Sequence, residues 1–236
     1  MTEGISQRTG ILIGEEGIEA LRDSYVVLAG AGAVGGYALE GLVRAGVGHI
    51  KVIDADVFNG SNLNRQILAT VDTIGRPKAD VAIERARSIN PDIDITAERE
   101  FVSEDTVPEL LRKRPDVLVD AIDTIQHKVS LLRYVAMNDI VTFSSMGAAL
   151  HMDAGKIRIA NVLGTKVCPL ASRIRHELRD LDTKNITCVY SEEKPIHVDM
   201  DRDEHGKSVL GSLSTIPAIF GMTLANEAIR YIITKK

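Results

Sequence analysis

The chain has 236 residues, a formal net charge of −5 and 44% hydrophobic residues. This length suits a single domain with a sizeable core, and the acidic balance excludes a surface that binds nucleic acid all over, so such binding needs a local basic patch. Two cysteines, Cys168 and Cys188, are too few for a four-cysteine zinc cluster. With no signal peptide or long apolar run in view, we expect a reducing, cytoplasmic location and no membrane contact.

A glycine-rich turn dominates the first part of the chain. A short amphipathic helix is predicted over residues 14–21, and a β-branched strand follows at Val26–Ala29. The next residues permit a tight turn at Gly30, a close backbone approach to a phosphate at Gly32, and close helix–strand packing at Gly35. The motif predicts a nucleotide without saying which one, and a purely structural turn is the alternative.

The second predicted strand, His49–Ile53, ends at an acidic residue. Asp54 stands where ribose hydroxyls come in such folds, and a carboxylate accepts hydrogen bonds from both of them. Asp56 follows closely and is a second candidate for the nucleotide site. Up to this point, the chain also fits an NAD-binding domain.

The segment over residues 54–66 distinguishes an NAD-binding domain from a domain that binds another nucleotide. It places Asn62, Arg65 and Gln66 a few residues after the ribose carboxylate. A guanidinium at this edge of the sheet binds phosphate oxygens through two hydrogen bonds. A solvated loop is the alternative.

A helix is predicted from Lys78 to Asn90, with proline just before its start and just after its end. Lys78 therefore stands near a helix N-terminus, from which it can reach a triphosphate. On its own it would be an ordinary surface lysine.

A nearly continuous apolar strand over residues 117–122 follows a strand at 93–97 and a helix at 108–112. Such a strand is typical of the centre of a parallel sheet, so Asp123 lies at its carboxyl end. One carboxylate near a triphosphate is what Mg²⁺ usually needs, and Asp123 is the metal candidate. An N-cap for the helix at 124–138 is the alternative, and Asp120 is the more structural acid.

The alternation of strands and helices predicts an α/β fold, with a Rossmann-like, mostly parallel sheet covered by helices on both faces. After the strand at 141–145 the pattern changes. We expect a strand at 156–160, a basic helix at 173–179, a mobile crossover at 191–207 and a last helix from Ser214. The prediction is one domain over 1–236. Residues 1–150 form the nucleotide-binding half, and 151–236 carry a smaller mixed sheet portion with substrate-binding and dimerisation surfaces.

Several blocks in order and spacing resemble the ubiquitin-activating-like (ThiF/MoeB/HesA) superfamily of ATP-dependent adenylating enzymes. They are Gly30–Gly35, Arg44–Gly48, Asp54–Asp56, Asn62–Gln66, Gly75–Lys78 and Asp120–Asp123. The resemblance implies that Asp54 holds ribose, that Asn62, Arg65 and Lys78 hold phosphates of ATP, and that Asp123 holds Mg²⁺. It also implies a homodimer in which Arg8 reaches the partner's ATP. Ala33 stands where glycine is common.

The carrier-protein activators of this superfamily usually hold structural zinc with two CxxC motifs, which this sequence lacks, so no zinc is expected. The second half, with Cys168–Leu170 and Cys188–Glu192, instead resembles the tRNA threonylcarbamoyladenosine dehydratases. These enzymes adenylate the side-chain carboxylate of a tRNA nucleoside and close it into a ring, releasing AMP and pyrophosphate.

Two rival functions stay open at this point. One is an adenylyltransferase for the C-terminus of a ubiquitin-like sulfur carrier, which would pass the carrier to Cys188. The other is a nicotinamide-dependent oxidoreductase, in which Arg65 and Lys78 would have no evident role. A buried structural role for both cysteines is the simpler expectation.

If tRNA is the substrate, a local basic surface must contact its phosphates. The candidates are Lys166, Arg173, Arg175, Arg179 and Lys184. A solvated helix face is the alternative. A cysteine desulfurase or sulfur-acceptor system is a further candidate partner.

Overall fold

The computed structural model describes residues 4–197 and 210–235. A seven-stranded sheet runs through both halves in the order β3-β2-β1-β4-β5-β7-β6. The strands are β1 (Tyr25–Ala29), β2 (His49–Ile53), β3 (Asp94–Glu98), β4 (Val117–Asp120), β5 (Thr142–Ser145), β6 (Ile157–Asn161) and β7 (Ile186–Ser191). All neighbours pair in parallel except β6 with β7, which confirms the Rossmann-like sheet and its mixed C-terminal extension.

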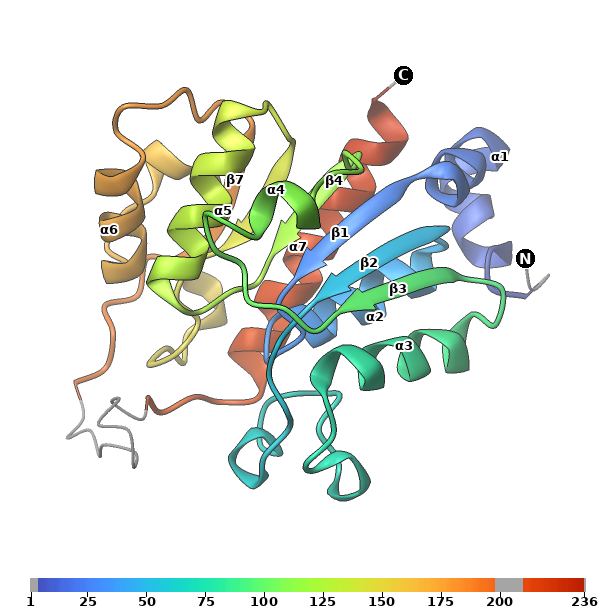
Figure 1. The fold of residues 1–236 in the computed structure, drawn as a ribbon, viewed down its shortest axis with the longest axis horizontal. Helices are drawn as coiled ribbons and strands as arrows, with labels where there is room; N and C mark the ends of the chain where they lie inside the picture. The colour runs from blue at the N-terminus through green and yellow to red at the C-terminus, as the bar shows by residue number, and fades with distance from the viewer. Residues whose placement is uncertain (1–3, 198–209, 236) are drawn as a thin grey trace.

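Helices cover both faces of the sheet (Figure 1). One layer holds α1 (Gln7–Asp23), α2 (Gly35–Ala45), α3 (Lys78–Ile89) and α7 (Thr215–Thr234), and the other holds α4 (Val107–Leu110), α5 (Ile125–Met137) and α6 (Pro169–Glu177). Within the described residues there are also four short 3₁₀ turns: η1 (Gly60–Asn62), η2 (Val71–Thr73), η3 (Ala154–Lys156) and η4 (Val162–Gly164). The two layers enclose two apolar cores, one against each face, as a central parallel sheet requires.

Strand register decides where the site lies. Ala29 at the end of β1 pairs with Ile53 of β2 and with Asp120 of β4. Asp120 in turn pairs with Ser144 of β5. Because these strands are parallel and end at the same level, the segments that follow them emerge side by side at the carboxyl edge of the sheet.

Some predicted boundaries differ from the structure. A helical segment that was not predicted precedes residue 14, and Gly14, with φ 73° and ψ 175°, interrupts α1 between that segment and the one that covers the predicted range. The basic helix begins at Pro169 and ends at Glu177, not at residues 173 and 179. Ser191 ends a buried strand that pairs with β5 and β6, so the predicted crossover starts after it. Residues 198–207 of that crossover lie outside the described residues.

Candidate functional site

Two glycines shape the turn between β1 and α2. Gly30 has a φ of +91°, and a Cβ there would lie 2.8 Å from the Ala121 carbonyl oxygen. A Cβ on Gly35 would lie 1.8 Å from the Gly30 carbonyl oxygen. Both positions therefore exclude side chains by contact with backbone.

Gly32 in the same turn is different. Its nearest neighbour would be Nε2 of Gln66, at 3.9 Å from an added Cβ, which is ordinary van der Waals contact. Packing within the chain therefore does not require glycine at this position. The absence of a side chain leaves backbone open for a ligand, as the sequence predicts for a phosphate loop.

Asp54 comes directly after β2 and turns toward this loop. Its Oδ2 accepts a hydrogen bond from the Ala31 N–H at 2.7 Å, and its Oδ1 accepts one from the Asp56 N–H at 2.8 Å. Burial raises the pKa of the Asp54 carboxyl, against the opposing effects of Lys78 and of these N–H groups. Each oxygen retains a lone pair for a further donor, such as a ribose hydroxyl.

Lys78 is the first residue of α3, and its ammonium is paired. Its Nζ lies 2.9 Å from Oδ2 of Asp56, and its side chain is 9% exposed while that of Asp56 is 58% exposed. The expectation that this lysine stands at a helix N-terminus is confirmed. In the described structure the cation is held by a carboxylate of the same edge.

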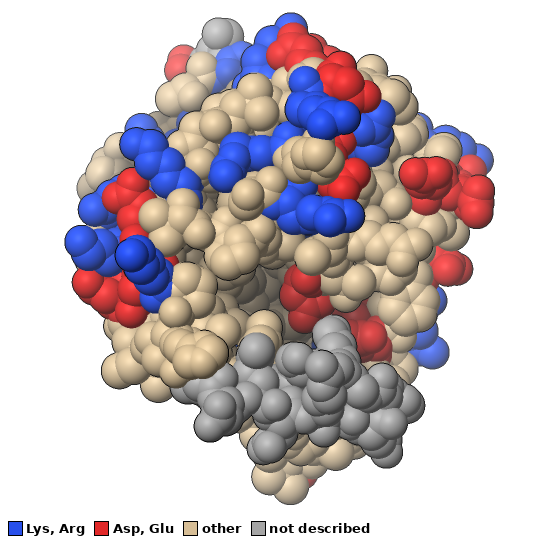
Figure 2. Space-filling model, turned by 90° about the vertical axis from the view of Figure 1, so that its left-hand side faces the viewer, with Lys and Arg blue, Asp and Glu red and all other residues tan. Residues whose placement is uncertain are grey.

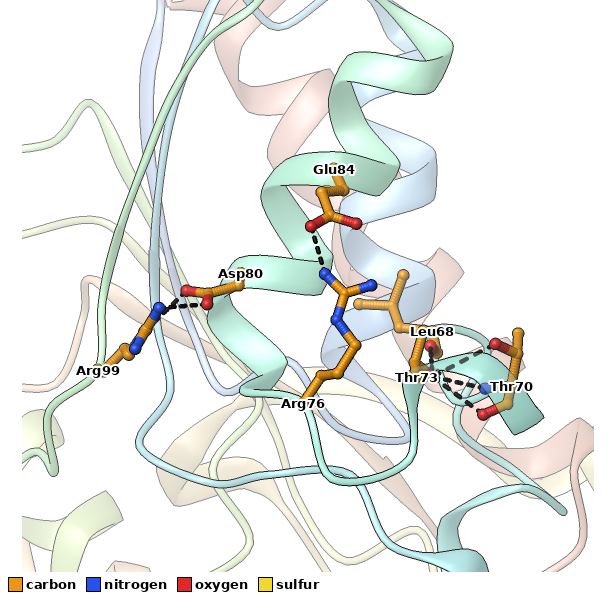
Figure 3. Close-up of polar contacts among 7 residues, drawn as sticks. All are labelled: Leu68, Thr70, Thr73, Arg76, Asp80, Glu84 and Arg99. Carbon is orange, nitrogen blue, oxygen red and sulfur yellow. Dashed lines mark hydrogen bonds and ion pairs between the residues drawn. The ribbon is translucent and has the colours of Figure 1, made fainter.

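Ion pairs anchor the segment that carries Lys78 (Figure 3). Arg76 reaches Glu84 along α3, and Arg99, in the segment that follows β3, binds the carboxylate of Asp80. Thr73 fastens the preceding turn by hydrogen bonds to the backbone of residues 68 and 70. These contacts fix the start of α3 relative to the sheet edge.

The segment around η1 contributes three candidates. Asn62 is buried, and its Oδ1 accepts a hydrogen bond from the Asn59 N–H at 3.1 Å, so part of its amide is used within the loop. Arg65 Nη1 donates to the Ser61 carbonyl at 2.8 Å and to Oδ1 of Asn64 at 2.9 Å, which leaves its Nε and Nη2 hydrogens available. The buried Oε1 of Gln66 has no hydrogen-bond partner within the described residues. Water or a bound molecule has to supply one.

The end of β4 carries two acids with different roles. Asp123 is exposed, and its Oδ1 accepts a hydrogen bond from the Thr124 hydroxyl at 3.2 Å. The residue at the N-cap of α5 is Thr124, so the alternative that Asp123 caps this helix is wrong. A solvent-facing carboxylate beside a phosphate loop has the donor character of a Mg²⁺ ligand that relies on phosphates and water for its other ligands.

Asp120 is fully buried and forms a structural network, as expected. Its Oδ2 binds the ammonium of the equally buried Lys128 and accepts a hydrogen bond from the Ser144 hydroxyl at 2.6 Å. Its Oδ1 accepts from the Ile122 N–H at 3.0 Å, which fixes the turn leading to Asp123. Sequence reasoning missed Lys128; a lysine within a helix that is otherwise buried on that face was the available signal.

These contacts bring most of the predicted residues to one edge: the glycine turn, Asp54, the Asp56–Lys78 pair, Gln66 and the end of β4. Arg8 is not among them. It belongs to α1, which lies beyond the amino ends of the strands (Figure 1).

The predicted basic surface on and after α6 is largely paired within the chain. Arg173 binds Glu177 at 2.9 Å, and Lys184 lies 3.3 Å from Asp182. Arg175 donates from Nη1 to the carbonyl and hydroxyl oxygens of Thr165, both at 2.8 Å. Figure 2 looks onto the side of the molecule on which α6 lies and shows Lys and Arg interspersed with Asp and Glu. Arg179 is exposed.

Both cysteines are buried. Burial raises the pKa of the Cys188 thiol to about 12, so the thiolate is scarce at neutral pH and the thiol is a poor nucleophile. Among the described residues, no cluster of three or more His, Cys, Asp or Glu side chains has the arrangement of a metal site. Within the same residues, no helix has the length and hydropathy needed to cross a membrane.

Comparison with known proteins places this edge in context. The model of the ThiF family matches residues 6–236. The chain is 34% identical to the tRNA threonylcarbamoyladenosine dehydratase of Bacillus subtilis, over 94% of this chain and 92% of that protein. It is 41% identical to the sulfur carrier protein ThiS adenylyltransferase of B. subtilis, but over only 50% of this chain and 35% of that protein.

Solved structures agree with the sequence comparison. The E. coli tRNA N6-threonylcarbamoyladenosine dehydratase in complex with AMP superposes with a TM-score of 0.89 at 30% identity, covering 97% of this chain and 93% of that one. The same enzyme in complex with ATP gives a TM-score of 0.88 with the same coverage. The likeness therefore extends beyond the nucleotide-binding half.

Proposed function

The chain belongs to the ThiF family, and from this premise we propose that it is an ATP-dependent tRNA threonylcarbamoyladenosine dehydratase. The reaction joins the side-chain carboxylate of the modified nucleoside to AMP, releases pyrophosphate, and then closes the ring. One observation carries the proposal: the glycine turn, Asp54, the Asp56–Lys78 pair and Asp123 emerge at one sheet edge, in a chain similar to such dehydratases over nearly its whole length.

The nucleotide contacts follow from this edge. The partly exposed backbone at Gly32 takes a phosphate, and the ribose hydroxyls donate to the Asp54 carboxylate. Lys78 exchanges its bond to Asp56 for a bond to phosphate oxygens. The unused N–H groups of Arg65 also donate to phosphate oxygens. Gln66 and Asn62 line the segment between them.

Asp123 fits Mg²⁺, because it is an exposed carboxylate at the phosphate-loop edge. When bound, the ion would neutralise charge on the phosphates. No zinc is needed for any step.

The chemistry needs positioning more than covalent assistance. An oxygen of the substrate carboxylate attacks the α-phosphorus of ATP. The bond between this phosphorus and the oxygen that bridges it to the β-phosphate breaks, and pyrophosphate leaves with the electron pair of that bond. A nitrogen of the same side chain then attacks the activated carbonyl carbon, loses its proton and expels AMP. Lys78 and Arg65 stabilise the developing negative charge, which is the main contribution of proteins to phosphoryl chemistry. Ring closure is intramolecular, and good orientation lowers its barrier by roughly 7–11 kcal/mol.

The remaining parts of the proposal concern assembly. Arg8 reaches the ATP site of a second subunit, as the resemblance to adenylating enzymes implies, and its helix α1 lies away from the phosphate loop of its own chain (Figure 1). Ile219 and Met222 of α7 are exposed beside Tyr37, in an apolar hollow of about 410 Å³, which supports a homodimer contact there. We treat 1–236 as one functional domain; a cysteine desulfurase or sulfur-acceptor partner stays a prediction.

The tRNA surface is proposed on and after α6. Arg179 and the partly paired Arg173, Arg175 and Lys184 lie there, and phosphates would replace some of their present carboxylate partners. Affinity for tRNA should then fall steeply as salt rises. A flat salt response would count against this surface.

A sulfur-carrier adenylyltransferase is the second candidate, favoured by the 41% identity to such an enzyme over half of the chain. Incubation with labelled ATP and either threonylcarbamoyl-modified tRNA or a carrier protein ending in glycine separates the two. We expect AMP release and cyclised nucleoside, detected by mass spectrometry, with the tRNA alone. AMP release that requires the carrier would overturn the dehydratase proposal.

A further inference from the structure

A cavity of about 600 Å³ lies between the segment after β3, the start of α5, and α6. Its walls include Ile125 and Gln126 of the first turn of α5, and Arg173 and Glu177 of α6. Ile125 is only two residues from Asp123. The cavity therefore lies beside the turn that carries Asp123, and α6, the helix proposed to contact tRNA, forms part of its wall.

An aromatic pair stands beside this cavity, and one of its two rings, that of His127, forms part of the wall. The ring of Phe101 stacks on that of His127, with centroids 5.4 Å apart and an interplanar angle of 19°. His127 lines the cavity, while Phe101 remains 55% exposed. Exposed aromatic rings are the usual stacking platforms for unpaired bases.

The hydrogen bonding of His127 is fixed on one side. Its Nδ1 lies 2.6 Å from the Val102 carbonyl oxygen, which can only accept, so Nδ1 carries the hydrogen. In the neutral ring, Nε2 is then an acceptor. Gln126 makes no side-chain hydrogen bond within the described part of the chain, and its amide offers both a donor and an acceptor beside the imidazole.

The charged side chains that line the cavity indicate which part of a nucleotide it can bind. Glu104, Asp105 and Glu177 line it, and their carboxylates repel phosphate. Arg173, which is paired with Glu177, is the single cation on the described walls. A neutral base with N–H donors is therefore favoured inside, and the sugar–phosphate backbone is favoured outside, on the arginines of α6.

Resting on the proposed function, we propose that this cavity binds the threonylcarbamoyl-bearing base of the tRNA, extruded from its loop and stacked on the Phe101–His127 pair. The substituent spans only a few bonds from the base to its carboxylate. A base held beside Ile125 therefore places that carboxylate at the turn that carries Asp123 and next to the phosphate loop. The cavity then provides specificity for an RNA nucleoside, and the residues at the carboxyl edge of the sheet activate its carboxylate.

The absence of tryptophan from the sequence gives a direct test. Phe101→Trp keeps a stacking surface and supplies a single fluorescent reporter. We expect its emission to be quenched on addition of modified tRNA, and less so by the same tRNA without the modification. Met137→Trp is the matched control, because Met137 is also exposed but lies ten residues further along α5 than His127, about 15 Å away, and should report no change.

Kinetics complete the test. Phe101→Ala should raise the KM for modified tRNA about tenfold, as expected for losing one base–aromatic stack, and leave the KM for ATP unchanged. Gln126→Trp, which fills the cavity from an exposed position, should abolish turnover of tRNA while ATP still protects the protein from thermal unfolding. Unchanged tRNA kinetics in Phe101→Ala and Gln126→Trp, with no quenching of the Phe101→Trp emission, would overturn the cavity proposal. Failure of the parent enzyme, without any substitution, to cyclise the modified tRNA would instead overturn the proposed function.

Discussion

Lys78 and Asp56 are joined twice. The ammonium of Lys78 lies 2.9 Å from the Asp56 carboxylate, and the Lys78 N–H also donates to the Asp56 carbonyl at 2.9 Å. The start of α3 is thus tied to the segment after β2, and the Lys78 ammonium lies beside the phosphate loop. A nucleotide that binds here has to compete with Asp56 for that cation.

Replacing this cation should affect chemistry more than stability. Lys78→Met should lower AMP formation by about 10²–10³-fold, because a charge stabiliser of the transition state is lost. The fold should survive, since the Asp56 carboxylate is mostly exposed and regains water. Lys51→Met is the matched control: Lys51 is 14% exposed, pairs with Glu98 at 3.2 Å, and lies in β2 away from the edge. Equal losses of activity in both variants would contradict a role for Lys78 in the reaction.

The glycines of the turn should separate packing from binding. Gly35→Ala should prevent folding, because its Cβ would lie 1.8 Å from a backbone oxygen. Gly32→Ala should keep the melting temperature and weaken ATP binding tenfold or more, measured by calorimetry, because a methyl group would occupy the approach of the phosphate. Gly60→Ala, with nothing within 4 Å of its added Cβ, should change neither quantity. Normal ATP affinity in Gly32→Ala would refute the phosphate loop.

Replacing Asp54 should affect the pH dependence of protein stability and the affinity for ATP in opposite directions. Its carboxyl has a raised pKa in the folded protein, so keeping it ionised costs folding free energy above that pKa, and the cost disappears as the pH falls below the unfolded value near 3.9. Asp54→Asn removes this ionisation cost, but its amide nitrogen cannot accept one of the two backbone N–H bonds, which is a loss at every pH. The gap in melting temperature between variant and parent should therefore shift in favour of the variant as the pH rises from 4 to 7. ATP should bind 10- to 100-fold more weakly to the variant. A gap that stays constant with pH would rule out the ionised carboxylate as its cause.

Cys188 should be dispensable for chemistry. The thiol is fully buried and its pKa is about 12, so it does not attack an acyl-adenylate at neutral pH. Cys188→Ala should retain AMP release and ring closure within severalfold, with only a loss of stability of about 1 kcal/mol. Detection of a covalent adduct on Cys188 by mass spectrometry during turnover would contradict this prediction and favour the carrier-activating function.

The buried pair of Asp120 and Lys128 should be costly to break from one side. Lys128→Met leaves the Asp120 carboxylate unpaired in the interior and should lower the free energy of unfolding by about 3–5 kcal/mol. Adding Asp120→Asn should recover part of this loss, measured by urea denaturation. Lys184→Met at the exposed Asp182 pair should change it by less than about 1 kcal/mol. Equal effects at the two lysines would show that Lys128 is hydrated.

Much of the fold follows from local pattern. The β-branched runs of β1, β2 and β4 indicate buried parallel strands, and their register brings Gly30, Asp54 and Ala121 to one edge without further information. The acids at the ends of these strands could be assigned to a common edge for the same reason. The assignment of individual roles to them remains a prediction.

Features that depend on tertiary contacts could not be predicted. Lys128 has a partner because α5 packs its first turns over the end of β4, which no spacing in the sequence indicates. Arg175 is polar and helical like its neighbours, yet it fastens Thr165 instead of facing solvent. The residues of β7 favour a strand, but only the sheet shows that this strand lies between β5 and β6.

The position of α1 has a consequence for how the enzyme would work in dilute solution. The helix that carries Arg8 and the turn that carries Gly32 lie at opposite ends of β1 (Figure 1). A solitary polypeptide would therefore have a nucleotide pocket lacking one guanidinium, and its specific activity would decline as dilution separates the subunits. Mixing an Arg8→Ala chain with a Lys78→Met chain should then restore part of the rate, because one hybrid pocket would hold both intact cations.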